Sequence, residues 1–337
     1  MIKLLMFVGL LGFANAESCN NDGQTYAEGS ITFETSSFAD LSLTDDEIAD
    51  KVLAMFENSV CPQGTAEAQS CGTGKCDTDT TRIKSYYYEK NVKYPSTETE
   101  ENYRLIITNG MPDHCSSVDQ VKANPNMPCE HFYGMLVPLV PDISDTMTEW
   151  GMGGIGMMTT GALVYNHKSA EDECNAAAIS EADTLDSCLG HADANCHYHY
   201  HSVPECARGY NKCKLMGYMR DGVPIYGQCN LYFESAPTTL VEMTSSYTQI
   251  AGTSGCDTSD YEYTANSGML DDANGYLFPE GATSQNGRFT FAAGTYVYFF
   301  TETYPFSQVG YKGVRYNGRG VAQTPRKICE FTMDDMA

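Results

Sequence analysis

At residues 188–201 the chain reads CLGHADANCHYHYH, and the alternation at its end is the strongest local signal in the sequence. His197, His199 and His201 are spaced two residues apart, with Tyr198 and Tyr200 between them. Successive side chains of an extended strand point to opposite faces. The pattern therefore predicts a strand that presents three imidazoles on one face and two phenol rings on the other.

The spacing of these histidines limits how they could bind a metal ion. Residues two apart on a strand are separated by roughly 6.7 Å, and two such imidazoles can converge on one ion at about 2.0–2.1 Å per bond. His197 and His201 would lie about 13 Å apart unless the strand bends. A single-ion site is therefore expected to use two of the three, together with His191 or His114.

The predicted metal ligands are His114, His191, His197, His199, His201 and Asp221. Imidazole donors favour Zn or Cu, with Ni as a further candidate, whereas recruited aspartates favour harder ions. Ca²⁺ is less favoured, because residues 272–275 match only part of the calcium-binding loop of an EF-hand. Two other interpretations stay open: a Tyr/His ladder that only packs a sheet, and a pH sensor.

The charge of the chain excludes several classes of function. The sequence has 20 Lys+Arg against 44 Asp+Glu, for a formal net charge of -24. A protein that binds nucleic acid by neutralising phosphates needs clustered basic residues. Anionic lipid likewise repels a strongly acidic surface. With 42% hydrophobic residues in 337, the chain is expected to fold as one large domain or two small ones.

The N-terminus has the features of a secretory signal peptide over residues 1–16. Lys3 precedes a short apolar run, and Ala14-Asn15-Ala16 has the small-x-small form of a cleavage site. The run is too short to cross a bilayer comfortably, and no later stretch is apolar enough to span one. The mature protein is therefore expected to be secreted and extracellular.

The chain has 14 cysteines, an even number. In an oxidising compartment such a count predicts disulfides, whose connectivity cannot be read from spacing. A thiolate metal site would need paired Cys-x-x-Cys units, and the sequence has none.

Secondary-structure patterns indicate an N-terminal helix followed by β structure. Residues 44–60 have helical periodicity, with a capping box formed by Thr44 and Glu47. Residues 61–81 are predicted as a cysteine-containing loop, and residues 166–189 as a short helix or a long loop. The remaining apolar runs are short and bounded by turn residues, which is typical of strands.

Three of these predicted strand segments are specific enough to test. Residues 103–108 should form a strand that ends at an Asn-Gly turn. Residues 214–226 should form a hairpin around Asp221-Gly222, with Pro224 placing its second strand at a sheet edge. Residues 290–301 alternate well enough to form one strand.

The expected fold class is therefore mainly β or α+β, with an antiparallel sheet core, long disulfide-tied loops and an N-terminal helical element. The predicted organisation is a signal peptide at 1–16, a helix and Cys-rich loop segment at 17–100, and one domain at 101–330.

An ordered set of motifs resembles the YHYH domain, a family of exported proteins. The matching stretches are residues 108–114, 161–166, 188–191, 198–201, 217–227, 286–289, 294–298 and 304–306. The resemblance covers roughly residues 103–318 and implies an exported domain without an established reaction. The histidines at family positions are His114, His191, His199 and His201.

These patterns favour a non-catalytic extracellular protein that binds a metal ion or serves as a structural component. The chain contains no nucleophile elbow and no P-loop, and its glycine-rich run at 151–156 does not open a βαβ unit. One alternative is an extracellular Zn or Cu enzyme in which Asp221 or Asp113 acts as base or orients a ligand. Another is a self-assembling matrix or coat protein with purely structural histidines. The expected partners are a metal ion, a second copy or extracellular matrix, but neither nucleic acid nor membrane.

Overall fold

The structure is a computed structural model that describes residues 37–58, 85–97, 99–114, 124, 126, 128–186, 188–204, 213–316, 322–323 and 325–336. The predicted signal peptide at 1–16 and the predicted loop at 61–81 lie outside these ranges. None of the described helices has the length and hydropathy that a transmembrane span requires.

The described residues form a mainly β fold, which confirms the predicted class. One sheet has the order β1 (Tyr87–Val92), β2 (Tyr103–Thr108), β3 (Phe132–Pro138), β21 (Cys329–Phe331). The largest has the order β15 (Gly275–Leu277), β18 (Tyr296–Phe299), β10 (Pro224–Tyr226), β9 (Leu215–Met219), β5 (Gly154–Met158), β6 (Leu163–Tyr165), β8 (Tyr198–Tyr200), β7 (Gly190–Ala192). Its pairing is antiparallel except at β6–β8 and β10–β18.

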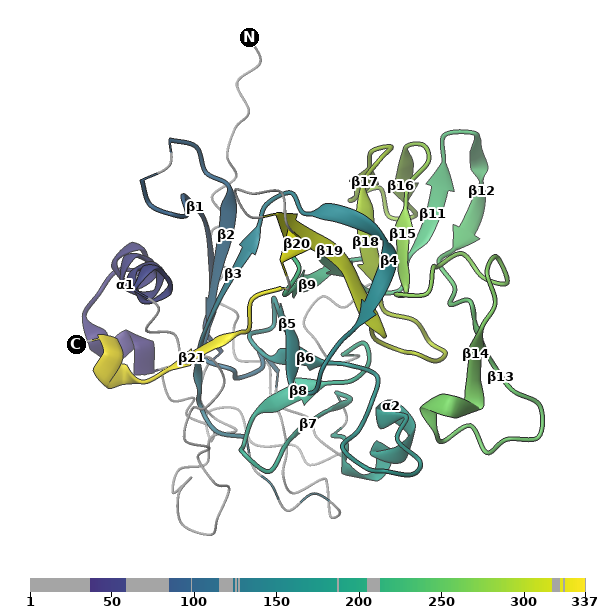
Figure 1. Cartoon of the computed structure of the whole chain (residues 1–337), viewed down its shortest axis with the longest axis horizontal. Helices are drawn as coiled ribbons and strands as arrows, with labels where there is room; N and C mark the ends of the chain where they lie inside the picture. The colour runs from purple at the N-terminus through teal and green to yellow at the C-terminus, as the bar shows by residue number, and fades with distance from the viewer. Residues whose placement is uncertain are drawn as a thin grey trace, which may run out of the picture.

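Three smaller sheets complete the β structure. Their orders are β12 (Ala236–Glu242), β11 (Asn230–Phe233), β16 (Ala282–Ser284), β17 (Thr290–Phe291); then β13 (Tyr247–Gln249), β14 (Tyr261–Tyr263); and β20 (Ala322–Gln323), β19 (Gly310–Tyr316), β4 (Asp142–Glu149). Figure 1 shows β11–β18 gathered at the end of the molecule opposite the N-terminal helix.

The N-terminal helix α1 (Asp45–Glu57) begins where the sequence predicts. The Thr44 side chain accepts from the backbone of Glu47, whose carboxylate accepts from the backbone of Thr44, so the predicted capping box is confirmed. The helix ends at Glu57 with Asn58 as its C-cap, before the predicted end at Val60. Three acids in its first turn complement the helix dipole.

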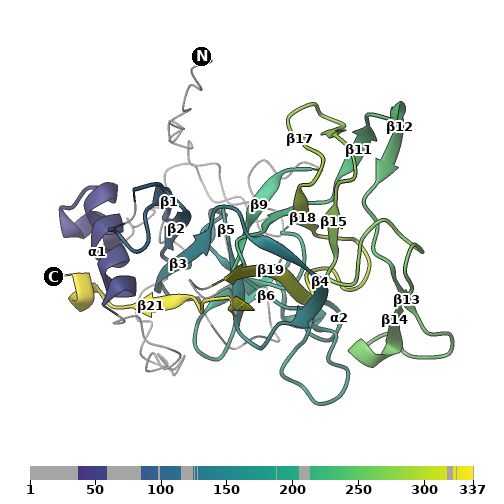
Figure 2. The ribbon, with the colours of Figure 1, turned by 45° about the horizontal axis from the view of Figure 1, so that its top comes forward.

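Helix α1 packs its apolar face on the sheet β1–β2–β3–β21. Ile48, Val52 and Phe56 share a buried cluster with Leu105 of β2 and Leu136 of β3. The short helices η1 (Ser37–Leu41) and η6 (Met333–Met336) flank it, and Figure 2 shows α1 beside β21 and the C-terminus. Because β1 pairs along its whole length with β2, the segment before residue 100 shares a core with the segment after it.

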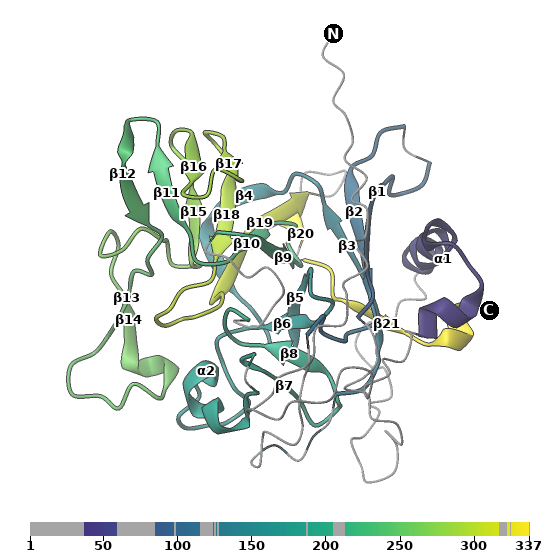
Figure 3. The same ribbon diagram turned by 180° about the vertical axis from the view of Figure 1, so that it is seen from behind.

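The eight-stranded sheet carries the histidine-rich strand. Tyr198 and Tyr200 of β8 are fully buried in a core that also contains Met216 and Met219 of β9. Strand β7 lies on the outer side of β8, and Figure 3 shows both strands close to α2 (Ala177–Ser180). The predicted tyrosine face of this strand is therefore confirmed as a core face.

Two strand predictions need correction. Pro224 does not lie at a sheet edge, because β10 pairs with both β9 and β18. Proline is tolerated there because it is the first residue of the strand, and the ladder with β18 begins only at Ile225. Residues 290–301 form two strands, β17 and β18, because the chain turns at Gly294, whose φ is +82°.

The segment 166–189 forms a loop with two short helical turns, α2 and η4 (Ala182–Thr184). A disulfide between Cys174 and Cys256 joins this loop to the region of η5 (Thr258–Asp260), and a second joins Cys213 and Cys229. The predicted disulfide-tied loops are therefore present.

Candidate metal centre

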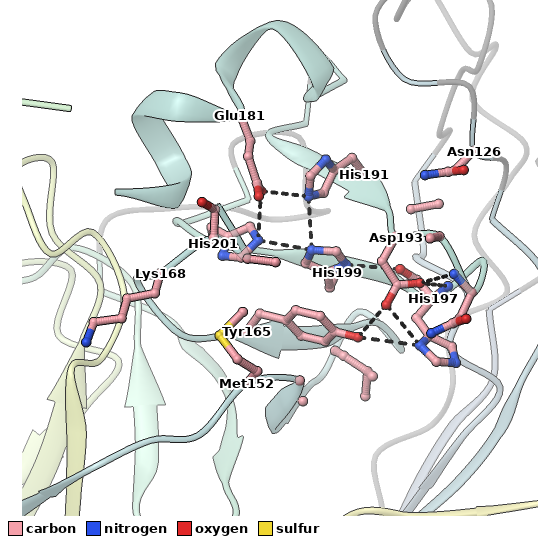
Figure 4. Close-up of a pocket in the computed structure, with 18 of the residues that line it drawn as sticks. Asn126, Met152, Tyr165, Lys168, Glu181, His191, Asp193, His197, His199 and His201 are labelled. Atoms are coloured by element: carbon pink, nitrogen blue, oxygen red, sulfur yellow. Dashed lines mark hydrogen bonds and ion pairs between the residues drawn. The ribbon is translucent and has the colours of Figure 1, made fainter. Parts of the chain in front are cut away.

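Four of the seven histidines line one cavity of about 810 Å³. Its walls come from the loop before α2, from η4, from β7 and β8, and from the segment leading into β21. Figure 4 shows His191, His199 and His201 turned toward one another with Glu181 above them, while His197 lies apart beside Asp193.

Strand register places the first two imidazoles. His191 of β7 lies directly opposite His199 of β8 in an antiparallel pair, and facing residues in such a pair have their side chains on the same side of the sheet. His201 follows β8 immediately. Glu181 follows α2, on the loop that the Cys174–Cys256 disulfide tethers.

These four residues form what we call the trihistidine group: Glu181, His191, His199 and His201. The Nε2 atom of His199 lies 2.9 Å from that of His191 and 3.0 Å from that of His201. The Oε2 atom of Glu181 lies 3.3 Å from the first and 3.1 Å from the last. His199 and His201 are buried, with His199 at 2% exposure, whereas Glu181 and His191 are half-buried.

The other nitrogen of each imidazole is tied to the protein. His199 Nδ1 bonds the carbonyl of His197 at 3.0 Å, and His201 Nδ1 bonds the carbonyl of Asn166 at 2.7 Å. A carbonyl oxygen can only accept, so both Nδ1 atoms carry a proton and donate.

The third imidazole is oriented by a hydroxyl group. His191 Nδ1 lies 2.8 Å from the Thr184 hydroxyl, which donates its own proton to the carbonyl of Glu181 at 2.7 Å. The hydroxyl oxygen therefore accepts from His191 Nδ1. With each Nδ1 tied to an acceptor, all three imidazoles turn their Nε2 atoms toward one another and toward a carboxylate oxygen.

Four converging lone pairs repel one another unless a cation lies between them. Tetrahedral Zn²⁺ with 2.0–2.1 Å bonds separates its ligand atoms by roughly 3.3 Å, close to the 2.9–3.3 Å separations found here. Fixing Nδ1 by an outer hydrogen bond is also how proteins orient metal-binding histidines. Three imidazoles and one carboxylate suit Zn²⁺, Cu²⁺, Ni²⁺ or Fe²⁺.

The electrostatics of the group follow from its burial. Desolvation, together with the neighbouring His201 and His191, holds the pKa of His199 well below its ordinary value, so this imidazole is neutral. Burial alone would raise the pKa of Glu181, but its contacts with His191 and His201 outweigh burial and lower it. The site therefore pairs an ionised carboxylate with the neutral imidazole of His199.

A second set of side chains, the ion-pair group, consists of His131, His197, Glu330 and Asp193. Glu330 Oε1 lies 2.8 Å from His131 Nδ1, and Glu330 Oε2 lies 3.7 Å from His197 Nε2. His197 Nδ1 lies 3.1 Å from Asp193 Oδ2. Burial would lower the pKa of His197, but these two carboxylates raise it to about 9. This imidazole is therefore a cation between two anions.

Tyr165 of β6 separates the two groups. Its ring stacks on His199 with centroids 3.8 Å apart and planes 14° apart. Its hydroxyl donates to Asp193 Oδ2 at 3.0 Å. One aromatic side chain therefore packs against the trihistidine group and bonds to the ion-pair group (Figure 4).

Two predicted ligands lie outside both groups. His114 contacts the rings of Tyr198 and Tyr200, and its Nε2 bonds the Tyr200 hydroxyl, so it lies on the face of β8 opposite His199. Asp221 is buried in the β9–β10 turn.

The Asp221 carboxylate binds donors of the protein itself. It accepts from the Tyr298 hydroxyl at 2.7 Å and from the backbone of Gly313 at 2.9 Å and Val223 at 3.1 Å. Burial, only partly offset by these donors, raises the pKa of Asp221 to about 6.

Sequence reasoning did not find Glu181, Thr184 or Glu330. Glu181 is one of several acids in a segment predicted only as loop or short helix, and nothing in its spacing marks it. Thr184 acts through one hydroxyl, and Glu330 is more than 130 residues from His197. His131 is likewise absent from the predicted ligands.

Comparison with known proteins identifies the central part of the chain. The family model described as YHYH protein matches residues 135–313, which is more than half of the sequence. The match contains the whole trihistidine group but neither His131 nor Glu330. No curated protein and no solved structure matches the chain.

Proposed function

Because the chain belongs to the YHYH protein family, for which no reaction is established, we propose a function from its site: it is a secreted, disulfide-containing protein that binds one divalent transition-metal ion at Glu181, His191, His199 and His201. Zn²⁺ and Cu²⁺ are the leading candidates, and the carboxylate adds Fe²⁺. The binding is proposed to be non-catalytic.

One observation carries the proposal: each of the three imidazoles donates from Nδ1 to a fixed acceptor, so that all three Nε2 lone pairs face Glu181 Oε2. Histidines that only pack a core need no such convergence, since each can satisfy its second nitrogen separately. A disulfide on the loop of Glu181 supports the same function, because it restrains the ligand that comes from outside the sheet.

The number of protein donors favours a binding site over a reaction centre. Structural Zn²⁺ sites use four protein ligands, whereas catalytic ones use three and leave a position for water. The trihistidine group offers four. The disulfides support an extracellular location, since such bonds persist in oxidising compartments.

A metal-dependent enzyme is the second candidate function, and one observation favours it. All four residues of the trihistidine group line the 810 Å³ cavity, which is large enough for a small molecule. If the carboxylate of Glu181 moved off the ion, a coordination position would face this cavity.

Elemental analysis of the native secreted protein tests the proposal. We expect one transition-metal ion per chain, and a melting temperature that falls when a chelator removes the ion. Protein without stoichiometric metal, whose melting temperature is insensitive to chelator, would contradict it.

Replacement of the ion by Co²⁺ separates the two candidates. A closed four-ligand site gives a tetrahedral visible spectrum that azide leaves unchanged. An open site binds azide and changes its spectrum, which would favour the enzyme.

A further inference from the structure

Arg220 lines the same cavity and has no acidic partner among the described residues. Its Nε donates to the carbonyl of Arg326 at 2.8 Å, and one terminal nitrogen donates to the carbonyl of Gly154 at 3.3 Å. Its guanidinium lies over the Trp150 ring, 5.6 Å from the centroid. The groups that the guanidinium contacts directly are therefore neutral.

A partly buried cation that has no carboxylate in direct contact is energetically unfavourable. The neighbouring Asp221 does not neutralise it at contact, because that carboxylate is bonded to Tyr298 and Gly313. A guanidinium has five N–H donors in a planar fork, so donors remain beyond the two carbonyl bonds.

Lys327 adds a second such cation to the cavity wall. Its side chain is exposed, and no carboxylate of the described residues lies within salt-bridge distance. Lys168, also in the wall, differs because it pairs with Glu149 at 3.4 Å. Lys93, Arg288 and Arg326 of the described residues also lack a carboxylate within salt-bridge distance, so what distinguishes Arg220 is its half-buried position in the cavity wall.

We propose that the cavity binds a small molecule bearing an oxyanion, a carboxylate or a phosphate, with Arg220 as its principal contact and Lys327 at the rim. Both oxyanions fit the guanidinium fork through two oxygens. The inference deepens the proposed function, and it rests on that function in one respect: the bound metal ion would add positive charge to the cavity. The contact with Arg220 does not require the ion.

The chain contains its own reporter for this binding. Trp150 is the single tryptophan, and it packs under Arg220. The experiment titrates metal-loaded protein with succinate and, separately, with inorganic phosphate at constant ionic strength in chloride, and follows tryptophan fluorescence.

Three variants locate the binding site. R220K keeps the positive charge but loses the planar fork of donors. K327Q removes an exposed charge, and folding of this variant should be unaffected. R288Q is the matched control, because Arg288 is exposed and lies outside the cavity lining.

We expect saturable binding of at least one probe, weakened about tenfold or more by R220K, several-fold by K327Q, and not at all by R288Q. The probe that binds identifies the oxyanion. Absence of saturable binding by both probes, or affinities unchanged in both R220K and K327Q, would overturn the inference.

A metal-free H199A variant separates this inference from the proposed function. Binding that is weaker in H199A but still sensitive to R220K supports the Arg220 contact, whether or not the metal site is confirmed. Binding that is lost in H199A but unchanged in R220K would indicate that the probe binds the metal ion directly, and would overturn the role of Arg220.

Discussion

Two histidine groups meet at one cavity, lined by the whole trihistidine group and by His197, Asp193 and Glu330 of the ion-pair group, and they accommodate buried imidazoles in opposite ways. In the trihistidine group one carboxylate faces three imidazoles, and every Nδ1 proton is already used by a carbonyl or hydroxyl. In the ion-pair group Asp193 and Glu330 face His131 and His197, so each imidazole has a carboxylate for its proton. Under the proposed function the trihistidine group takes a cation from outside, whereas the ion-pair group already contains the cationic imidazole of His197.

The difference shows that a histidine count is a poor guide to metal binding. His197 and His199 are two residues apart, yet His197 is held as a cation and His199 as a neutral donor. What distinguishes them is the number of acids nearby and which ring nitrogen is tied.

The largest expected effect is the loss of metal in H199A. His199 Nε2 touches both other imidazoles of its group, so its removal should reduce bound metal from about one ion per chain to nearly none. H197A is the matched control and should keep the ion, because the contact that orients His199 comes from the backbone carbonyl of residue 197. Elemental analysis of both variants measures the bound metal. Equal losses of metal in H199A and H197A would contradict the distinction between the two groups.

D221A tests a buried carboxylate that faces no histidine. Its removal leaves the Tyr298 hydroxyl and the backbone N–H groups of Gly313 and Val223 without their acceptor. The free energy of unfolding should fall by ~2–4 kcal/mol, measured by urea denaturation. Metal content should not change, and a folded D221A protein without metal would return Asp221 to the set of ligands.

T184V sharpens the account of the trihistidine group. Valine keeps the shape of the side chain but removes the acceptor for His191 Nδ1. Loss of such an outer partner typically weakens metal affinity about 10–100-fold, while saturating metal should still fill the site. Chelator competition measures the affinity, and T184S should restore it because the hydroxyl returns. An unchanged affinity in T184V would show that Thr184 does not orient His191.

The smallest effect is expected for E330Q, in the ion-pair group. Burial would raise the pKa of Glu330, but His131 and His197 lower it to about 2, against about 4.3 in the unfolded chain. A depressed carboxyl pKa stabilises the fold above about pH 4 and loses that contribution as pH falls toward 2. The free energy of unfolding of E330Q should therefore depend less on pH between about 4 and 2 than that of the unmodified protein. At neutral pH it should be about 1 kcal/mol lower, and the bound metal should be retained. A drop in bound metal in E330Q would show that the ion-pair group contributes to metal binding and is not separate from the trihistidine group.

Local patterns predicted several elements closely. The strand at 103–108 and the capping box of α1 were confirmed, as was the hairpin around Asp221-Gly222. Each depends on contacts between residues near in sequence, or on a periodicity of two or 3.6 residues. The single strand expected at 290–301 was wrong, because alternation does not reveal a turn that needs the positive φ of Gly294.

The candidate site was predictable only in part. Strand geometry limited one ion to two of the three alternating histidines and left His191 or His114 as the further donor. The structure brings His191, His199 and His201 together and places His114 on the opposite face of β8. The position of Glu181 depends on a loop held by a disulfide between cysteines that are 82 residues apart in the sequence. No periodicity in the sequence predicts such a contact.

The sequence by itself determined the β-rich class, the acidic surface, the disulfide chemistry and the alternation that buries Tyr198 and Tyr200, because composition and strand periodicity are local properties. Only the tertiary structure decided which imidazoles face a carboxylate, which ring nitrogen of each donates a hydrogen bond, and that Arg220 lies in the same cavity wall. Those outcomes depend on the packing of segments far apart in the chain. There a shift of an ångström or two changes a hydrogen-bond partner, and with it the charge of the site.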